Sequence, residues 1–556
     1  MKTRKYLALF IAAVLVVGVL LTGCSSSKQK NNAANNGSNT GNKSYDELVK
    51  KLPTLKYLTD DTTQAKIDAQ VFQQMWKKNL GINVEIETVP FKTRLERMNK
   101  YDYQIVMAGW GPDYNDPMTF MDLWTSWSAN NNSGWTNSEY DKLIKDAQNT
   151  NDNARRMDDF KKAEKLLLDQ MPIGPVYYRY ISYAVKPDVQ GLVRRFVGGD
   201  VDFYWTSTKS GTLRYNLVQE PPQMDPQQTS DAVSMNVINA VMEGLMRYDK
   251  SGKVMPGIAE SYTVSKDGLT YTFKLRDAKW SNGDPVTAQD FEYAWKRALD
   301  PKLGALYAYI LYPIKNAEAY NTKKITDPNQ VGVKALDAKT LQVTLERPTP
   351  YFPDLTAFAT YMPLNQKFYE TVKDKYGSEP DKMLYNGPWV IKSWTHQQKM
   401  VLEKNPNYWN KDAIKLNRIE FSMITDRNTE LNMFLTGQLD VDQRVAGDQF
   451  DQVKKAGYDI KSFSDGSSWY FQFNTKDPIL KNANIRKALT LAIDRNTYVK
   501  NILKDASKPA TGYVPDIMWG NKDTFRKEAG DMLPSSDVKQ ARDLLIKGIK
   551  ELGLDK

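Results

Sequence analysis

The residue types best suited to covalent chemistry are scarce in this chain of 556 residues, which has one histidine, His396, and one cysteine, Cys24. Nucleophilic catalysis by serine or cysteine needs a nearby base, so a histidine-based site would rest on His396 alone. His396 lies in a polar, turn-like segment, and the sequence has no HExxH motif, phosphate-binding loop or paired cysteines. We therefore expect no catalytic residues, no metal site, no cofactor and no enzymatic activity.

Carboxylates are the other groups that could bind a cation or transfer a proton. Asp440 and Asp442, followed by Gly447, resemble a calcium loop only weakly, because the ligand spacing is absent. Hydrolysis of a sugar by a carboxylate pair stays an alternative, although no motif indicates it.

The segment GWGPDYNDP at 109–117 is the most distinctive acidic stretch. Its Asp113, Asn115 and Asp116 are most simply interpreted as turn formers whose side chains bond to the backbone before a proline. Spacing alone therefore favours a structural loop over a binding site here.

Alternating helical and strand patterns around these segments predict a mixed α/β fold. Residues 55–58 are expected to form a strand, 64–79 an amphipathic helix and 82–89 an alternating strand. Such a unit predicts parallel pairing of its two strands. Hairpins are expected at 262–275 and 331–345.

The last part of the chain predicts a helix that begins from an N-cap at Ser536 or Asp537. About 500 residues beyond the N-terminal segment are more than one hydrophobic core usually serves, which predicts two or three domains.

The N-terminal segment has the features of a bacterial lipoprotein leader. Basic residues precede an apolar run at 6–21 that is too short to span a bilayer comfortably, and LTGC at 21–24 matches a lipobox. We expect a signal peptide at 1–23, a lipid on Cys24 and a disordered linker at 24–44. A plain secretory signal with an incidental cysteine is the alternative.

The formal net charge of +10 at pH 7 could suggest nucleic-acid binding. Three of the positive charges lie in the leader, and the other basic residues alternate with acidic ones, as at 373–375. The sequence has no basic stripe interleaved with aromatic residues. We therefore expect a globular protein with a mixed surface and no nucleic-acid partner.

Several long motifs resemble family 5 of the extracellular solute-binding proteins, the oligopeptide-binding class. The longest is GIAESYTVSKDGLTYTFKLRDAKWSNGDPVTAQDFEYAWKRALDP at 257–301. The others are NGP at 386–388, NPNYW at 405–409, GQLD at 437–440, IRKALTLAIDR at 485–495, MWKKNLG at 75–81, AGWGPDYNDP at 108–117 and PVYY at 175–178. The resemblance implies a two-lobed fold of the type II periplasmic binding proteins, with an extra subdomain.

The order of these motifs is unusual, because the family's usual N-terminal part starts at Thr212 and its usual C-terminal part precedes it, at 45–209. The resemblance therefore implies a circular permutation, with the old ends joined near 209–212. The last helix would then pack against the segment that starts at Tyr45. The implied domains are a second lobe at 45–180 and 464–556, a first lobe at 181–255 and 389–463, and an extra subdomain at 256–388.

The family implies that the protein captures oligopeptides in a cleft between the lobes and delivers them to the permease subunits of an ABC importer. Together with the lipid anchor, this places a monomer on the extracellular face of the bacterial cell membrane. Alternatives are a binding protein for dipeptides, metal chelates or a signalling peptide, and a sensory lipoprotein without a transporter.

The resemblance also implies roles for individual residues. In the family an aspartate of the segment resembling GWGPDY binds the peptide ammonium, which carries over to Asp113. Gly109 and Gly111 would let the ligand backbone approach closely, and Trp110 would wall a side-chain pocket. Tyr307 resembles a cleft tyrosine, with core packing as the alternative.

Trp469 and Tyr470 lie in a segment that borders the ligand in the family, although aromatic core packing would explain them equally well. The chain departs from well-known members at three positions. Phe91 stands where a pocket tryptophan is usual, Met107 where an arginine can meet the peptide C-terminus, and Arg179 where a cleft tyrosine occurs. We hypothesise that Arg179 replaces the lost cation.

Overall fold

The computed structural model describes residues 44–150, 152–197 and 199–556. The expected signal peptide, the lipid acceptor Cys24 and the linker up to residue 43 lie outside the described residues. Tyr45–Lys556 forms one unit by its internal contacts, and its interleaved helices and strands confirm the mixed α/β fold. In the described part of the chain, no helix is both long and apolar enough to cross a membrane.

The largest sheet has seven strands, in the order β15–β4–β16–β3–β1–β2, with β17 paired to β4. Its strands come from both ends of the described chain, so neither end forms this sheet alone. They are β1 (Leu55–Asp60), β2 (Val84–Val89), β3 (Ile105–Trp110), β4 (Ile173–Val185), β15 (Val441–Asp442), β16 (Ile460–Phe473) and β17 (Lys508–Pro509).

The expected strand-helix-strand unit is present at one edge of this sheet. β1 and β2 pair in parallel along their whole length, with α3 (Thr63–Leu80) between them in the chain. Thr62 caps α3 by accepting a bond from the Ala65 amide, and Gly81 ends it in the left-handed region. Because Phe72 and Trp76 are fully buried, α3 covers the sheet with an apolar face, and the predicted unit is confirmed.

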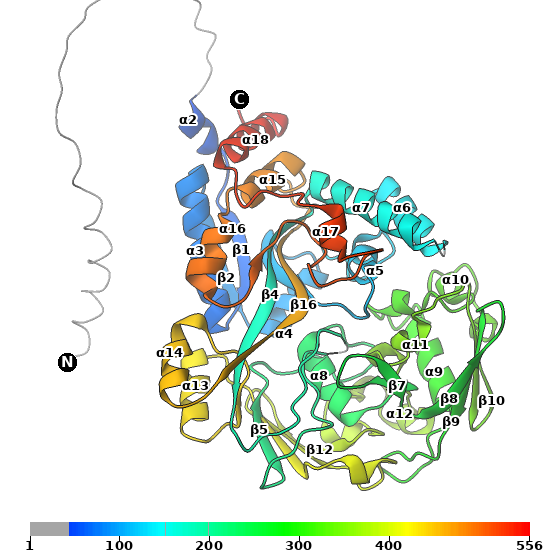
Figure 1. Ribbon diagram of the computed structural model, residues 1–556. Helices are drawn as coiled ribbons and strands as arrows, with labels where there is room; N and C mark the ends of the chain where they lie inside the picture. The colour runs from blue at the N-terminus through cyan, green and yellow to red at the C-terminus, as the bar shows by residue number, and fades with distance from the viewer. Residues whose placement is uncertain (1–43, 151, 198) are drawn as a thin grey trace, which may run out of the picture. The chain divides into compact units, whose positions relative to one another are not determined.

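β4 and β16 are long strands that pair antiparallel and run from the helices of this sheet towards β5 and β12 (Figure 1). Tyr180 lies opposite Ser464 and Ile181 opposite Phe463. The sequence predicts that one lobe ends after Tyr180 and another after Phe463. Both expected boundaries therefore lie inside strands, in β4 and β16, between residues that pair with each other. Beyond Ser464 the pairing is interrupted, so that residues 465–467 form a bulge.

Two further sheets have four strands each. The first, in the order β12–β13–β14–β5, consists of β12 (Trp389–Thr395), β13 (Lys399–Lys404), β14 (Arg418–Ser422) and β5 (Thr212–Asn216). The second, in the order β10–β11–β9–β8, consists of β10 (Val333–Asp337), β11 (Thr340–Thr344), β9 (Thr270–Leu275) and β8 (Ala259–Val264). Its β8–β9 and β10–β11 pairs are antiparallel, which confirms both predicted hairpins. A small pair joins β6 (Met246–Tyr248) to β7 (Val254–Pro256).

Helices cover these sheets and connect their strands. They are α2 (Tyr45–Val49), α4 (Phe91–Asn99), α5 (Met118–Met121), α6 (Ser138–Gln148), α7 (Asn153–Gln170), α8 (Ala232–Val241), α9 (Ala288–Leu299), α10 (Ala317–Asn321), α11 (Phe352–Leu355), α12 (Gln366–Val372), α13 (Arg427–Leu435), α14 (Phe450–Lys455), α15 (Ala483–Leu491), α16 (Arg495–Tyr498), α17 (Phe525–Ala529) and α18 (Val538–Glu551).

The last helix, α18, begins after Asp537, whose side chain accepts a bond from the Gln540 amide as predicted for the N-cap. Its Arg542 donates from Nε to the Asn79 carbonyl at 2.7 Å, and its guanidinium lies 5.1 Å from the ring centre of Tyr45. The first and last helices of the described unit therefore lie side by side, as Figure 1 shows for α2 and α18.

Candidate functional site

Asp113 lies in the loop that leaves the seven-stranded sheet after β3. Its side chain does not form the local turn that spacing alone favours, because Oδ1 accepts a 2.9 Å hydrogen bond from the hydroxyl of Tyr307. The turn belongs to Asp116, which accepts from the Met118 amide and pairs with Arg156. The two aspartates of the segment thus have different roles, and Asp113 is the one that faces another part of the chain.

The carboxyl of Asp113 is buried, with 8% of the residue exposed. Burial raises its pKa to about 8, against the opposing effect of the hydroxyls of Tyr307 and Thr119. Burial likewise raises the pKa of neighbouring Asp122, and the charge of Asp113 adds to that shift. Among the described residues neither carboxyl has an ion-pair partner, and Asp122 Oδ1 lacks even a hydrogen bond. The pair is therefore an acidic site that a cation would complete.

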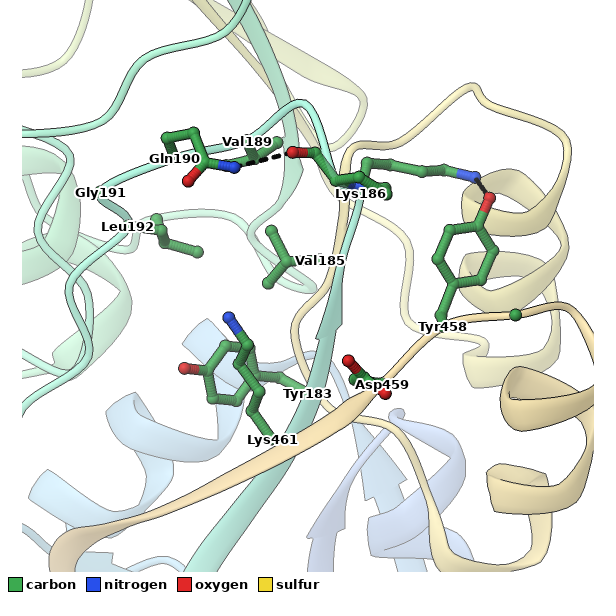
Figure 2. Close-up of a pocket in the computed structure, with 12 residues that line it drawn as sticks. Tyr183, Val185, Lys186, Val189, Gln190, Gly191, Leu192, Tyr458, Asp459 and Lys461 are labelled. Carbon is green, nitrogen blue, oxygen red and sulfur yellow. Dashed lines mark hydrogen bonds between the residues drawn. The ribbon is translucent and has the colours of Figure 1, made fainter.

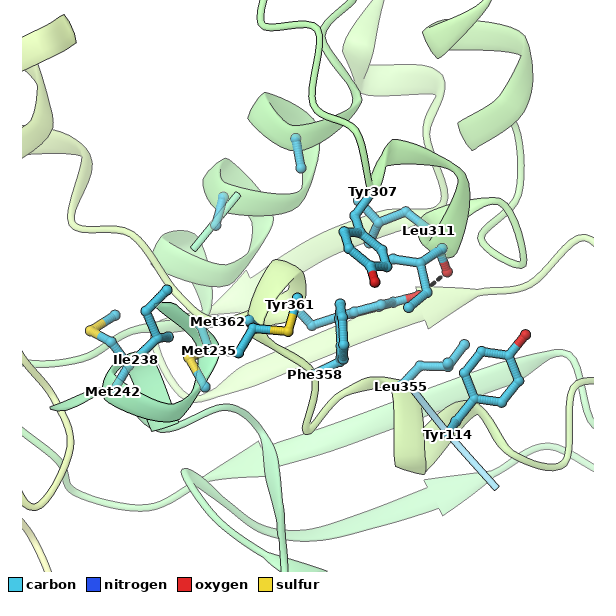
Figure 3. Packing of buried hydrophobic residues seen from close by; sticks show 14 of the residues in the cluster. Tyr114, Met235, Ile238, Met242, Tyr307, Leu311, Leu355, Phe358, Tyr361 and Met362 are labelled. Atoms are coloured by element: carbon cyan, nitrogen blue, oxygen red, sulfur yellow. Dashed lines mark hydrogen bonds between the residues drawn. The ribbon is translucent and has the colours of Figure 1, made fainter. Parts of the chain in front are cut away.

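Aromatic rings surround Asp113. Trp110 stacks on Tyr307 with ring centres 5.8 Å apart, and its indole donates to the Thr119 carbonyl. Tyr307 also packs against Phe358 at 4.9 Å, as Figure 3 shows. Because these rings exclude water, they strengthen any charge interaction made by Asp113.

Gly109 is held against the indole of Trp469. A Cβ atom at Gly109 would lie 2.5 Å from that ring, so only glycine fits without a shift. Trp469 stacks on Tyr177 at 5.9 Å, and its indole nitrogen has no hydrogen-bond partner among the described residues. At Gly111 a Cβ atom would lie 3.2 Å from the hydroxyl of Ser467. Both glycines therefore sit where β3 meets the bulge of β16.

Arg179 is not an unpaired cation. Its Nε donates to Asp465 Oδ2 at 2.6 Å, and its guanidinium lies 4.8 Å from the ring centre of Trp469. The Asp465 carboxylate therefore already neutralises the side chain that was expected to replace the lost family arginine. Tyr470 points into the aromatic core, 5.6 Å from both Trp124 and Tyr513, which favours the core-packing interpretation of this residue.

Phe91 and Met107 lie around one buried arginine. The guanidinium of Arg94 lies 5.2 Å from the ring centre of Phe91, and its Nη1 donates to the Met107 carbonyl at 2.6 Å. The structure therefore brings Asp113, Trp110 and Tyr307 into one cluster and Gly109 and Trp469 into an adjoining one, while Phe91 belongs to a third group.

Three further residues in this region were not expected from the sequence: Asp122, Asp465 and Arg444. Asp465 and Gly466 lie in the bulge of β16, between the paired residues Ser464 and Ser468. Arg444 follows the weak calcium-like motif. In the structure Asp440 of that motif bonds to Arg214, and no cluster of metal-ligating side chains occurs in the part of the chain described.

The single histidine, His396, lies between two acidic side chains. His396 Nδ1 lies 2.5 Å from Glu220 Oε1, and Nε2 lies 3.2 Å from Glu379 Oε1. The charge and hydrogen bond of Glu220, followed by those of Glu379, raise the pKa of His396. No serine or cysteine nucleophile is bonded to it among the described residues, so it bridges two acids.

A cavity of about 260 Å³ lies elsewhere, at the end of β4 (Figure 2). It is lined by Tyr183, Lys186 and Lys461 among others, and Lys186 Nζ bonds to the Tyr458 hydroxyl at 2.5 Å. None of the site residues expected from the sequence lines it. It is therefore separate from the Asp113 cluster.

The chain belongs to the bacterial extracellular solute-binding proteins, family 5. The model of the middle region of that family matches residues 28–132 and 253–556, which is more than half of the chain. The match falls in two separate stretches.

Individual relatives are named for peptide binding. The oligopeptide-binding protein OppA of Bacillus subtilis is 46% identical over 353 residues, covering 62% of this chain and 63% of that protein. The dipeptide-binding protein DppE of the same organism is 39% identical over 354 residues, with 62% and 63% covered. The chain thus spans under two thirds of the length of these curated relatives.

Solved structures show the same likeness. OppA of Listeria monocytogenes bound to peptide is 36% identical with a TM-score of 0.55, and the match covers 62% of this chain and 69% of that one. The substrate-binding domain of an oligopeptide ABC transporter from Bacillus anthracis is 37% identical with a TM-score of 0.55, with 62% and 67% covered.

Proposed function

We propose that this protein binds oligopeptides and that Asp113 receives the N-terminal ammonium of the peptide. The observation that carries the proposal is a buried carboxyl, held by Tyr307 and walled by Trp110, with no cation partner among the described residues. An ammonium placed there would ionise Asp113 and supply its missing partner. The names of the relatives support peptides as the class of ligand.

Backbone recognition would supply affinity without selecting a sequence. Gly109 and Gly111 carry no side chain at the end of β3, and the bulge at 465–467 is free of strand pairing with β4. An extended peptide could add to exposed backbone groups in this region while roomy pockets accept its side chains. This arrangement suits a transporter that accepts many peptides.

We further propose a permuted, two-lobed protein that is anchored outside the membrane through a lipid on Cys24, acts as a monomer and passes peptides to the permease of an ABC importer. The side-by-side packing of α2 and α18 supports the permutation. The leader motif supports the anchor.

Calorimetry of the purified protein tests the binding proposal. Alanine peptides of two to five residues would be titrated with free and acetylated N-termini, which also separates a preference for dipeptides from one for longer peptides. Asp113→Asn should weaken binding of free peptides about 100-fold or more, because one partner of a buried pair is lost. Asp158→Asn, an exposed acid of α7, is the matched control.

Two results would overturn the assignment. If acetylated and free peptides bind equally well, Asp113 does not hold an ammonium. If labelled peptides are turned over instead of retained, the protein is a hydrolase and not a binding protein.

A further inference from the structure

Arg444 is the residue that the cluster around Asp465 leaves without a partner. It follows β15 in the chain, and its side chain is exposed. In the described part of the chain, its guanidinium forms no ion pair with Asp200 or Asp465, the two acids whose charges act on it most strongly. An arginine of this kind can bind a carboxylate with two parallel hydrogen bonds.

Other side chains already occupy these two acids. Asp465 binds Arg179 through Oδ2 and accepts from the Ser467 amide through Oδ1. Asp200 binds Arg194 through Oδ2 and the Asn236 amide through Oδ1. Each carboxylate oxygen therefore has a donor, and Arg444 is left over.

The remaining acids near Arg444 do not replace that partner. Burial raises the pKa of both Glu430 and Asp442, and the charge of Asp442 adds to the shift of Glu430. Burial also raises the pKa of Asp505, against the opposing effects of its hydrogen bonds with Ser507 and of the charge of Arg179. Glu430 and Asp442 therefore carry less negative charge at neutral pH than ordinary carboxyls do.

The surroundings of Arg444 oppose its own charge. Desolvation and the positive charge of Arg179 lower its pKa, with a smaller effect from Arg194. The side chain is nevertheless exposed, so a ligand can reach it. An anion bound to Arg444 would offset both the desolvation of its guanidinium and the repulsion from Arg179.

Arg444 is connected to the segment that carries Asp113 through the Arg179–Asp465 ion pair. A Cβ atom at Gly466 would lie 2.9 Å from the ring of Pro112, and one at Gly111 would lie 3.9 Å from the Asp465 carbonyl. The loop that carries Asp113 therefore packs directly on the bulge whose acid interacts with Arg444. An acidic site and an unpaired cation thus adjoin the same stretch of β16.

We propose that Arg444 binds a carboxylate of the ligand, which is either the C-terminal carboxylate or an acidic side chain of the peptide. This inference rests on the proposed peptide binding. With Asp113 for the ammonium, the protein would hold a peptide by two opposite charges, and Arg444, not Arg179, would supply the cation.

Calorimetry with three alanine-based peptides of each length from two to five residues tests this role. The first has a free C-terminus, the second is amidated, and the third is amidated but carries one glutamate. Arg444→Gln should weaken binding about 10- to 100-fold for whichever carboxylate peptide uses the site, as expected for a charge-assisted pair. It should leave the neutral amide unchanged. Arg444→Lys should restore part of the affinity because it keeps the charge.

Arg155→Gln, an exposed arginine of α7, is the matched control and should change none of these affinities. Loss in the free-acid peptide alone assigns the C-terminus, and loss in the glutamate peptide assigns an acidic side chain. An equal effect of Arg444→Gln on all three peptides, or no effect, would overturn the inference while leaving peptide binding intact. If the unsubstituted protein binds none of them, both proposals fail.

Discussion

The hydroxyl of Tyr307 donates a 2.9 Å hydrogen bond to Asp113 Oδ1, although the two residues lie 194 positions apart in the chain. This bond connects the loop after β3 to the segment that follows α9. It favours the ionised carboxylate, but burial outweighs it, because the pKa of Asp113 is still raised to about 8. The hydroxyl thus positions the acid, while burial favours the protonated form of Asp113 at pH 7.

Tyr307→Phe should weaken peptide binding about 3- to 10-fold, because it removes one hydrogen bond to the acid that pairs with the ammonium. Calorimetry with a free alanine tripeptide measures the change. Tyr376→Phe is the matched control, since its buried hydroxyl has no hydrogen-bond partner among the described residues and its loss should not alter affinity. Equal affinities of Tyr307→Phe and the unsubstituted protein would show that this bond does not position Asp113.

Peptide binding at pH 7 should release a proton from Asp113. The pKa of about 8 keeps most of this acid protonated in the empty protein, and a bound ammonium would ionise it. Titration in two buffers of different ionisation enthalpy measures the released proton. Asp113→Asn should abolish the difference between buffers, and proton uptake by the unsubstituted protein would contradict the assignment.

The same raised pKa has a defined effect on stability. The folded protein binds the Asp113 proton more tightly than the unfolded chain, whose aspartates titrate near pH 4. The contribution of Asp113 to stability is therefore complete below about pH 4 and is lost as the pH rises towards 8. As the pH is raised from 5 to 8, the free energy of unfolding of Asp113→Asn, measured by urea denaturation, should therefore rise relative to that of the unsubstituted protein. A constant difference across that range would contradict this prediction.

The local elements were predictable because each has its own periodic signal. The strand-helix-strand unit at 55–89 and the two hairpins follow from alternation and turn residues, and α18 follows from its N-cap. The lengths of β4 and β16 were not predictable, because each strand changes its neighbours along its course. Pairing with β3, β15 or β17 at different points leaves no single pattern in the sequence.

The site was only partly predictable. Spacing could not tell Asp113 from Asp116, since both precede Pro117 in a loop, and only the family resemblance singled out Asp113. The contact with Tyr307 is tertiary and has no local signal. Arg179 was the obvious cation by position, but its neutralisation by Asp465 depends on the register of β4 and β16. The family resemblance therefore named Asp113, Trp110 and Tyr307, but not the contacts that join them.

Gly109→Ala should displace the indole of Trp469, because the new methyl group would lie 2.5 Å from the ring. We expect a change in tryptophan fluorescence and weaker peptide binding. Gly111→Ala is a milder comparison, since its methyl group would meet only the hydroxyl of Ser467 at 3.2 Å. If both variants behave alike, the close approach of Trp469 is not the cause.

The bridge formed by His396 should make a small, pH-dependent contribution to stability. Glu220 and Glu379 raise its pKa above the usual value near 6.5, so the contribution is complete below about pH 6.5 and is lost as the pH rises through the folded-state pKa. His396→Gln should therefore destabilise the protein at pH 6 but not at pH 9. The loss should stay below about 1 kcal/mol because the histidine side chain is 48% exposed. An equal loss at both pH values in urea denaturation would indicate packing instead of charge.

The buried pair of Glu164 and Arg526 should be needed for the two ends of the described chain to stay together. Glu164, on α7, binds Arg526 and also accepts bonds from the amides of Tyr513 and Val514 at 2.7 and 2.9 Å. Glu164→Gln should cost about 3–5 kcal/mol in the free energy of unfolding, because it leaves a buried guanidinium without its charge partner. Replacing the exposed Asp158 of the same helix by Asn should cost under about 1 kcal/mol.

Because α7 precedes the expected junction near 209–212 and Arg526 follows it, limited proteolysis of Glu164→Gln should release a fragment from the last part of the chain first. Unchanged stability and uniform cleavage would show that other contacts, such as those of α18, hold the ends together without this pair.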